Sequence, residues 1–533
     1  MAGFRMPETP RDQINLWPTR LEDALPADHP ARMMDLLLRS SAFHELFRTW
    51  EREYVLTEGQ PPYHPRDLAM LYIYGMLNGL RSSRKLEAAT YNRLDVIWLL
   101  NGQHPDHATL AAFVARHAPR LRDIKRKTVE IGIRAGLIKL EQVAVDGTKI
   151  EADAGRGSVQ GEESIRQKLA ALDQQIAAWE AEWAVNEAKE RGLLGDEIPW
   201  SARAASPAQQ LARANRKQER LTRAIDAMAR RRDESLAGGN EAPKAIAVVT
   251  DPDSRSMKDK EGRSKPNYNA QMAVDTSSGM VVADDVNDRT EDSGQLTPML
   301  EQVQQTCGQL PEQASADSQY NTGPELAKLE AMKVTGYVAA IHTRSDNAAP
   351  SAEQAEALAA VQAGATLSEA QWAALPRDGE QRIHKEAFVY VHEKDEYRCP
   401  AGFALPVLRM STNRSRGGAI KRTQYHCSSC LECSHAAMCC RDPAKGRIVN
   451  RDEYEDHRER MRERMKSREG RARYRRRRET VEPRFGHIKR TLGVRRFLRR
   501  GLEQVRAEWG LVCTAINVGV LLQHWEAVQR VLQ

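Results

Sequence analysis

The stretch that most constrains this chain lies near its C-terminus, where one glutamate stands within a run of cations, YRRRRETVEPRFGHIK at residues 474–489. Arg478 precedes Glu482 by four residues and Lys489 follows it by seven, so on a helix all three project from one face. Such a face can set a metal-binding carboxylate against a nucleic-acid backbone while the cations hold phosphates. Because Pro483 removes a helical hydrogen bond, we expect the helix to start or kink close to Glu482.

A basic helix with a purely structural role in a DNA- or RNA-binding protein is the alternative interpretation of this stretch. The net charge of the 533 residues is +7, which is modest, but residues 451–500 hold 20 Lys and Arg against 9 Asp and Glu. That concentration is typical of a polyanion-binding surface. The length predicts about two to four domains.

The N-terminal region, residues 1–135, has the periodicity of short helices. Pro65 can open a helix through DLAMLYIYGMLNGL, and Gly79 lies near its end. Short helices with tight polar links are compatible with a DNA-binding helix-turn-helix and equally with any small helical bundle.

Neither end of the sequence predicts a membrane protein. The first residues, MAGFRMPETPRDQ, lack the apolar region of a signal peptide. The apolar run from Leu511 to Leu522 is short for a bilayer and is interrupted by Asn517, so we expect a buried helix there.

Two aspartates follow β-prone segments. Asp146 lies in EQVAVDGTKIEAD, where Gly147 permits close approach or a bulge, although Asp-Gly is also an ordinary turn signal. Asp317 lies in QASADSQYN, before a polar turn and another helix. Between them, residues 268–286 predict a β-hairpin, and 334–342 predict one further strand.

Residues 156–240 predict an inserted arm. Ile165, Leu169, Leu172 and Ile176 recur at steps of four and three, which is the seam of a coiled-coil-like helix, and a second long helix follows. We expect an antiparallel helical hairpin, for which a spacer role is more probable than an enzymatic one.

The segment 345–385 is rich in Ala and Gln, and we expect a surface excursion with little regular structure. Beyond it, six of the eight cysteines fall within residues 399–440. In an intracellular chain such clustering favours a metal site over disulfides. The spacing predicts a structural zinc site, with Cys427 and Cys440 as alternative ligands to the set Cys399, Cys430, Cys433 and Cys439.

Asp146, Asp317 and Glu482 each end or stand in a structured segment. Two strand aspartates and a helix glutamate could meet around two magnesium ions and cut or join phosphodiester bonds. Their sequence spacing does not establish that they meet.

Four motifs in order, VAVDGTKIEA, YNAQMAVD, ASADSQYN and RETVEPRFGHIKR, with the cysteine cluster before the last, resemble the DDE transposases of bacterial insertion sequences. The resemblance covers nearly the whole chain. It implies an α/β fold, an RNase H-like mixed-sheet core with a helical N-terminal domain, an inserted helical hairpin and a small Cys-rich, zinc-ribbon-like insertion. It also implies that Asp146, Asp317 and Glu482 are catalytic and bind two Mg²⁺ or Mn²⁺ ions.

The resemblance divides the chain into four parts: 1–135, a DNA-binding domain; 136–344, the first part of the core with the arm at 156–240; 345–450, an insertion with the zinc module at 388–442; and 451–533, the remainder of the core. In the last part, Arg478 and Lys489 match the family's steps around the glutamate, whereas Tyr474 lies one residue farther from the arginine than is common. We expect DNA contacts from Tyr474, Arg475, Arg478, Lys489 and Arg490.

The implied partner is double-stranded DNA, both the element's terminal inverted repeats and a target, and the implied assembly is a homodimer on DNA without a membrane. The expected location is the bacterial cytoplasm, at the nucleoid when bound to DNA. Two other function classes stay open: a DNA-binding regulator that has lost cleavage, and an RNase H-like nuclease that only hydrolyses.

Overall fold

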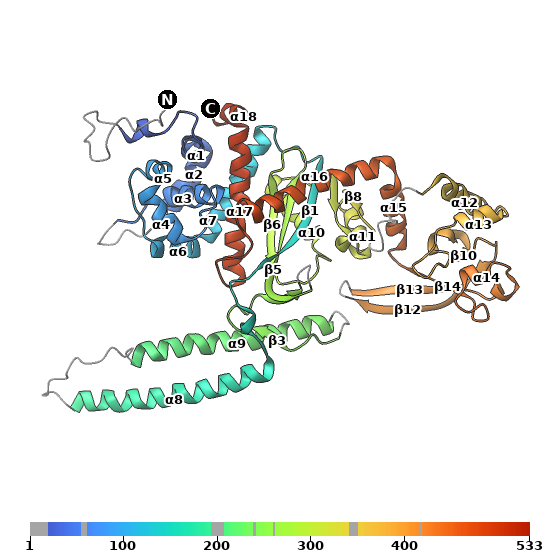
Figure 1. Ribbon diagram of the computed structural model, residues 1–533, viewed down its shortest axis with the longest axis horizontal. Helices are drawn as coiled ribbons and strands as arrows, with labels where there is room; N and C mark the ends of the chain where they lie inside the picture. The colour runs from blue at the N-terminus through green and yellow to red at the C-terminus, as the bar shows by residue number, and fades with distance from the viewer. Residues whose placement is uncertain are drawn as a thin grey trace, which may run out of the picture. The chain divides into compact units, whose positions relative to one another are not determined.

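The computed structural model describes residues 20–54, 61–192, 207–237, 241–258, 262–340, 350–415 and 418–533, with the backbone alone at 183–192, 207–208, 413–415 and 418. The chain divides into two compact units (Figure 1). The first comprises Met1–Ile138, His487–Val494 and Arg506–Gln533, and the second comprises Lys139–Gly486 and Arg495–Val505.

The first unit is helical, as predicted for residues 1–135. After a short 3₁₀ turn, η1 (Leu21–Ala24), its N-terminal helices are α1 (Pro30–Arg39), α2 (Ser41–Arg52), α3 (Pro65–Leu77), α4 (Ser83–Asn92), α5 (Leu94–Leu99), α6 (His107–Arg116) and α7 (Ala118–Arg134). Proline opens α1 and α3, where its missing N–H costs nothing. Ser82 and Asp106 cap α4 and α6 through their side chains. The predicted helix from Pro65 is therefore confirmed.

The predicted buried helix near the C-terminus is also confirmed, and it is longer than the apolar run. Helix α17 spans Leu502–Gln523 and α18 spans Trp525–Leu532. By length and composition α17 could cross a membrane. However, 83% of its most apolar 18-residue stretch is buried inside the protein, as in the core helix of a soluble protein. Asn517 is fully buried and donates a hydrogen bond to Thr128 on α7. Arg81 pairs with Glu508 at 2.9 Å, again with both side chains mostly buried.

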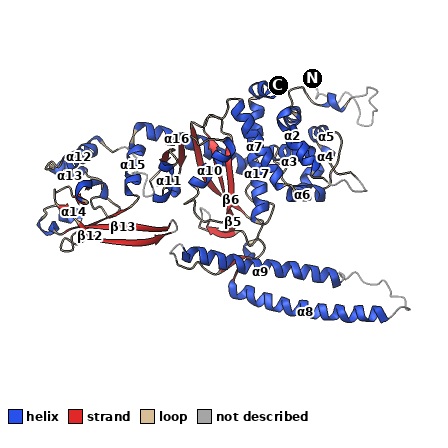
Figure 2. Ribbon diagram, turned by 180° about the vertical axis from the view of Figure 1, so that it is seen from behind, coloured by secondary structure: helices blue, strands red, loops and turns tan. Residues whose placement is uncertain are grey.

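The second unit is built on a six-stranded mixed sheet, shown in red in Figure 2. Its strands are β1 (Gln142–Glu151), β4 (Arg255–Lys258), β5 (Ser264–Asp275), β6 (Val281–Asn287), β7 (Gln313–Ala316) and β8 (Thr335–Val338). The order is β4-β5-β1-β7-β8, with β6 also paired to β5. Strands β1 and β5 are antiparallel, whereas β1, β7 and β8 run parallel. The predicted hairpin and the Asp146 strand are confirmed; of the predicted strand 334–342, residues 341 and 342 lie outside the described residues.

Four helices accompany this sheet: α10 (Leu296–Cys307), α11 (Gly323–Ala331), α15 (Glu455–Lys466) and α16 (Arg468–Arg490). Helix α10 packs on β5 and β6, and α11 and α15 pack on β8. The buried carboxylate of Glu325 on α11 accepts hydrogen bonds from the backbone N–H and the hydroxyl of Thr297, both at 2.8 Å. It thereby satisfies a donor in the first turn of α10, where a negative charge is favourable.

The predicted arm is present as two long helices, α8 (Glu162–Gly192) and α9 (Pro207–Ala237). They lie side by side in Figure 1 and in Figure 2. Ile165, Leu172 and Ile176 pack against Leu221 and other buried residues of α9. At its base lie a short 3₁₀ turn, η2 (Arg156–Ser158), and a two-stranded ribbon of β2 (Val159–Gly161) and β3 (Ile246–Val248). The seam residues named from the sequence therefore form the interface between the helices.

The prediction that residues 345–385 have little regular structure is wrong for the described residues 350–385. Helix α12 (Ala352–Ala363) begins at the side-chain cap of Ser351 and ends at Gly364, whose φ is +72°. Helix α13 (Glu369–Ala374) begins at a capping box from Ser368. Alanine has the highest intrinsic helix propensity, so the alanine-rich segment favours helices. The capping residues define where these helices begin and end.

These two helices join the core of the cysteine-rich module. The module contains β9 (Val389–Val391), β10 (Glu396–Arg398), β11 (Ala404–Leu405), β12 (Val407–Ser415), β13 (Gly418–Cys427), the short helix α14 (Ala436–Cys439) and β14 (Arg447–Asp452). Val361 and Trp372 pack in one buried cluster with Tyr397, Tyr425 and four of the cysteines.

The link between α10 and α11 yields a stability prediction. Glu325→Ala should lower the free energy of unfolding by about 1–3 kcal/mol, because two buried donors of Thr297 lose their acceptor. Urea unfolding followed by circular dichroism measures this. Glu301→Ala, an exposed glutamate on α10, is the control and should change little; equal effects of the two substitutions would contradict the capping role.

Candidate functional site

Asp146 and Asp317 lie next to each other because of the sheet register. Strand β1 pairs with β7 in parallel, with Val143 opposite Ala314 and Ala144 opposite Ser315. Continuing that register by two residues sets Asp146 beside Asp317, which directly follows β7. The Asp317 side chain accepts a hydrogen bond from the backbone N–H of Gln319, 2.9 Å away, and so caps the 3₁₀ turn η3 (Ser318–Tyr320). The structure thus brings two of the three predicted acids together.

A buried arginine offsets part of the negative charge of this pair. Arg477 on α16 is 5% exposed, and its Nη2 lies 2.8 Å from Oδ2 of Asp146. Its positive charge acts to lower the pKa of both Asp146 and Asp317. The Arg477 Nε has no hydrogen-bond partner among the described residues, so the guanidinium is only partly satisfied. The ring of Tyr474 lies 5.9 Å from the guanidinium carbon.

Both carboxyl groups ionise less readily than usual in spite of this cation. Burial raises the pKa of Asp146 to about 6, and the charges of Asp317 and Asp292 add to the effect against Arg477 and the backbone N–H of Gly147. Burial likewise raises the pKa of Asp317. The site is therefore a desolvated cluster of acids that favours any additional cation.

Glu482 does not join these two aspartates. Its side chain is 52% exposed, and its Oε1 lies 3.6 Å from Nε of Arg478. Within the described part of the chain, no group of three or more acidic, cysteine or histidine side chains is arranged to hold a metal ion. Tyr474 is influenced electrostatically by both locations. Burial is the main cause that raises the pKa of Tyr474, and the charges of Asp317, Asp146 and Glu482 also act to raise it.

The helix was expected to start or kink close to Glu482; the start is wrong, and the kink stays a prediction. Helix α16 begins at Arg468 and runs through Pro483, which lies inside it. The ring removes the bond that residue 483 would donate to the carbonyl of Glu479. Tertiary contacts hold this helix in place: Gln142 donates to the carbonyl oxygen of Arg473 at 2.8 Å, in addition to the Arg477 ion pair.

The remaining predicted DNA contacts are mostly on the surface. Arg475 is 79% exposed and lies 3.3 Å from Glu479, and Arg478 is 68% exposed. Arg490 is exposed and Lys489 is half-buried. Tyr474 instead is largely enclosed beside Arg477.

Sequence reasoning missed Arg477 and Asp292. Arg477 is one of four consecutive arginines, and its only signal is that it lies three residues after Tyr474, one turn along the helix. Asp292 lies in the loop before α10, and its Oδ1 accepts hydrogen bonds from Asn269 and Gln271, both at 2.6 Å. Gly147 makes room for it, since a Cβ at that position would lie 2.5 Å from the same oxygen.

The cysteines converge on one small cavity in their module. All six cysteines line it together with His435, which stacks on Trp372 with 3.9 Å between ring centroids. Its volume of about 20 Å³ suits one ion or one water. Burial raises the pKa of Cys439 to about 11, and the Cys399 and Cys430 charges act in the same direction, so these thiols are close neighbours. The cysteines of the described chain are free thiols, and they do not meet in the geometry of a metal site.

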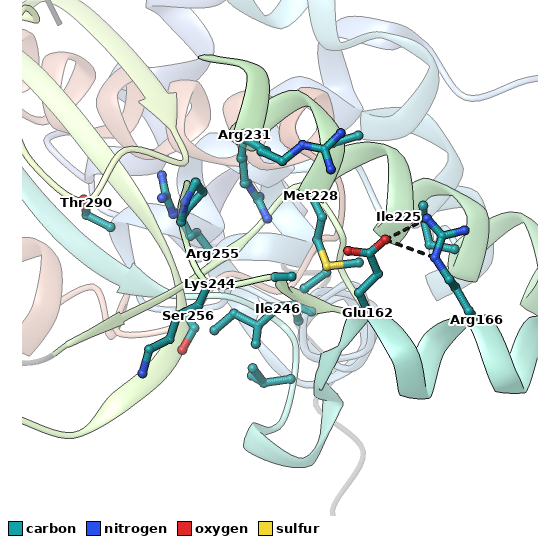
Figure 3. Close-up of a pocket in the computed structure, with 17 residues that line it drawn as sticks. Glu162, Arg166, Ile225, Met228, Arg231, Lys244, Ile246, Arg255, Ser256 and Thr290 are labelled. Atoms are coloured by element: carbon teal, nitrogen blue, oxygen red, sulfur yellow. Dashed lines mark hydrogen bonds and ion pairs between the residues drawn. The ribbon is translucent and has the colours of Figure 1, made fainter. Parts of the chain in front are cut away.

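A larger cavity of about 230 Å³ lies at the base of the arm (Figure 3). Two of its basic residues form ion pairs: Arg166 pairs with Glu162 at 2.7 Å, and the buried Arg231 pairs with Asp288 at 2.8 Å. Arg231 also donates to the backbone carbonyls of Pro252 and Ser254. The contacts of Arg231 attach the arm to the loops at residues 252–254 and 288, and the predicted catalytic acids do not line the cavity.

Three family models match the chain. Residues 19–116 match the model described as "Transposase domain (DUF772)", and residues 217–386 and 398–522 each match a model described as "Transposase DDE domain". Asp317 and Glu482 fall within matched segments, whereas Asp146 lies outside them. Searches of curated proteins and of solved structures give no significant match.

The resemblance implies that Asp146 binds a metal ion, and the raised pKa of Asp146 then yields a prediction for that binding. The carboxyl is protonated below about pH 6 and ionised above it, and only the ionised form binds a hard cation well. The affinity of the protein for Mn²⁺ should therefore fall as pH drops through about 6, which calorimetric titration would measure. Asp146→Asn removes the titrating ligand and should weaken binding and flatten the profile. A wild-type affinity that is constant across this range would contradict the assignment.

Proposed function

We propose, from the premise that this chain belongs to the DDE transposases, that it binds the terminal inverted repeats of its own element, hydrolyses the DNA at the ends and joins the freed 3′-hydroxyls to target DNA. The family catalyses DNA cleavage and strand transfer with divalent metal ions, so DNA is the substrate. The observation that carries the proposal is the buried carboxyl group of Asp146 beside the half-buried carboxyl group of Asp317, at neighbouring parallel strands.

Asp146, Asp317 and Glu482 are the carboxylates that we assign to the metal ions. The donor set fits, because Mg²⁺ and Mn²⁺ prefer carboxylate oxygen and the two aspartates form a desolvated anionic cluster. Two such ions would activate the attacking hydroxyl and stabilise the leaving oxygen. Glu482 must leave Arg478 and turn toward the aspartates, and Arg477 must yield part of its contact with Asp146. The core that holds these residues would be RNase H-like.

The cations of α16 have separate parts in this proposal. Arg475, Arg478, Lys489 and Arg490 would hold backbone phosphates and so position DNA without taking part in the chemistry. Arg478 becomes available for a phosphate when Glu482 leaves it. Tyr474, which lies beside Arg477 and is influenced by the charges of all three acids, would line the reacting phosphate. The helical N-terminal domain would recognise the end sequence.

Three further features belong to the proposal. The cysteine module would bind a structural zinc ion through Cys399, Cys430, Cys433 and Cys439, with Cys427 and Cys440 as alternatives, and would form a zinc-ribbon-like insertion. The active assembly would be a homodimer, since two DNA ends must be brought together. The location would be the bacterial cytoplasm, at the nucleoid.

A plasmid carrying the cognate ends distinguishes this function from its alternatives. A transposase joins ends to target, a nuclease leaves breaks alone, and a silent regulator yields neither. Inverted repeats in the DNA that flanks the reading frame would identify the substrate for this assay.

The glutamate assignment predicts that Glu482→Gln abolishes cleavage and joining. The loss should exceed roughly 100-fold, the upper end for residues that merely support a metal ligand, while end binding stays nearly intact. Gel assays of cleaved, joined and bound DNA measure the three outcomes. Glu479→Gln is the matched control, an acid three residues earlier that pairs with Arg475. Strand transfer by the Glu482 variant would show the assignment to be wrong.

The zinc assignment predicts about one zinc ion per chain in purified protein, measured by elemental analysis. Replacing Cys430 and Cys433 by serine should remove the zinc and lower the unfolding temperature, because metal binding contributes to folding. Cys307→Ser, outside the cluster, should change neither quantity. Native protein in which all six clustered thiols react freely with a thiol reagent would refute a zinc site.

A further inference from the structure

Strands β12 and β13 form a long two-stranded ribbon with an unusual charge. Figure 1 shows them as two arrows side by side, and they pair from Val407 opposite Tyr425 to Ser415 opposite Gly418. Residues 407–427 contain five basic residues and no Asp or Glu, although 29% of the chain is charged. The basic residues are Arg409, Arg414, Arg416, Lys421 and Arg422.

Much of this ribbon is uncovered. Strand β14 pairs with β13 only along residues 422–427, so the remainder of the ribbon has two free edges. Residues 406–410 are all exposed, as are Thr412, Ala419 and Lys421. Met410 is 68% exposed and Leu408 is 53% exposed, which is high for apolar side chains. A free, partly apolar edge is a liability unless it has a partner or a charge that prevents pairing.

The side chains of Arg409, Lys421 and Arg422 have no hydrogen-bond or ion-pair partner in the part of the chain that the structure describes. Asp452 lies opposite Arg422 on β14 but binds Arg458 at 2.7 Å. By contrast, Arg451 in the same sheet pairs with Glu459 and Asp456. These three cations are therefore available to an external anion.

The register places these cations on both faces of the ribbon. Arg409 and Arg422 share one face, because Arg409 lies opposite Gln424 and Ser411 opposite Arg422. Lys421 lies opposite Thr412 and shares the other face with Met410. A ribbon that enters the major groove of DNA has a phosphate backbone on either side, and the groove is wide enough for two strands. Cations on both faces match that environment.

We propose that the β12–β13 ribbon is a DNA-binding element that inserts into the major groove of the duplex, with Arg409 and Arg422 toward one phosphate backbone and Lys421 and Met410 toward the other. The proposal rests on the proposed transposase function, because duplex DNA is the polyanionic substrate of a transposase. The competing occupant of this edge is a second copy of the chain, whose β12 would pair with β12 of the first. The uniformly positive charge of the ribbon opposes it, since like charges on adjacent strands repel.

The test uses the full chain and a labelled random-sequence DNA duplex. The triple variant Arg409→Ala, Lys421→Ala, Arg422→Ala should bind at least roughly tenfold more weakly, and the slope of log affinity against log salt should fall by about three, close to one per phosphate contact. Fluorescence anisotropy over a potassium chloride series measures both. The control variant Lys394→Ala, Arg441→Ala, Lys445→Ala removes three other cations of the same module and should keep the wild-type slope.

A second measurement does not depend on these substitutions. A photo-crosslinking amino acid at position 410 should form an adduct with the duplex, and one at exposed position 394 should not. Equal slopes for the triple variant and the wild type, or no adduct at 410, would overturn the proposal. A triple variant that changes only the oligomeric state would assign the ribbon to a second copy instead. Cleavage by Glu482→Gln would refute the catalytic assignment while leaving the ribbon result in force.

Discussion

The ion pair between Arg477 and Asp146 is the interaction on which the geometry of the second unit depends. It joins a helix late in the chain to the central strand of the sheet, and both side chains are almost fully buried. A buried ion pair rarely gains stability over an apolar contact, and losing one partner leaves a costly isolated charge. Its value here is positional, since Asp317 lies beside it and the Arg477 charge acts to lower the pKa of both acids.

Helix α16 consequently uses its cations in two ways. Arg477 faces the sheet, whereas Arg475 and Arg478 face solvent and pair with glutamates of their own helix. Arg484 packs against the turn of the β5–β6 hairpin at Gly279, where a Cβ would lie 2.2 Å from its guanidinium and where φ is +70°. These inward arginines, with the hydrogen bond from Gln142, explain why the helix persists through Pro483. Glu482 lies between the two inward contacts and is exposed, free to move without unfolding the helix.

Much of this architecture is encoded locally and could be predicted. Proline at the first helical position, the TSSG turn between two β-prone runs and the heptad seam of Ile165, Leu172 and Ile176 each specify their own element. The adjacency of Asp146 and Asp317 depends on the register between strands about 170 residues apart, which no local pattern contains. The sequence alone could not show which of the four consecutive arginines faces inward, because only tertiary packing decides that Arg477 does. The helices of 345–385 were not predicted, because an alanine-rich segment carries no amphipathic pattern. The capping residues of these helices could have been recognised in the sequence.

The distribution of charge also shows why counting basic residues locates a binding surface poorly. The excess in residues 451–500 suggested a polyanion-binding face, yet many of those cations are engaged inside the unit: Arg458 with Asp452, Arg460 with Glu330, Arg462 with Glu455 and Lys466 with Glu386. Such pairs fix α15 against its neighbours and present little net field to a ligand. The β12–β13 ribbon has fewer basic residues but no acid to neutralise them. What identifies a phosphate-binding surface is therefore the unpaired cation, and on α16 both Arg475 and Arg478 are paired, with Glu479 and Glu482 respectively.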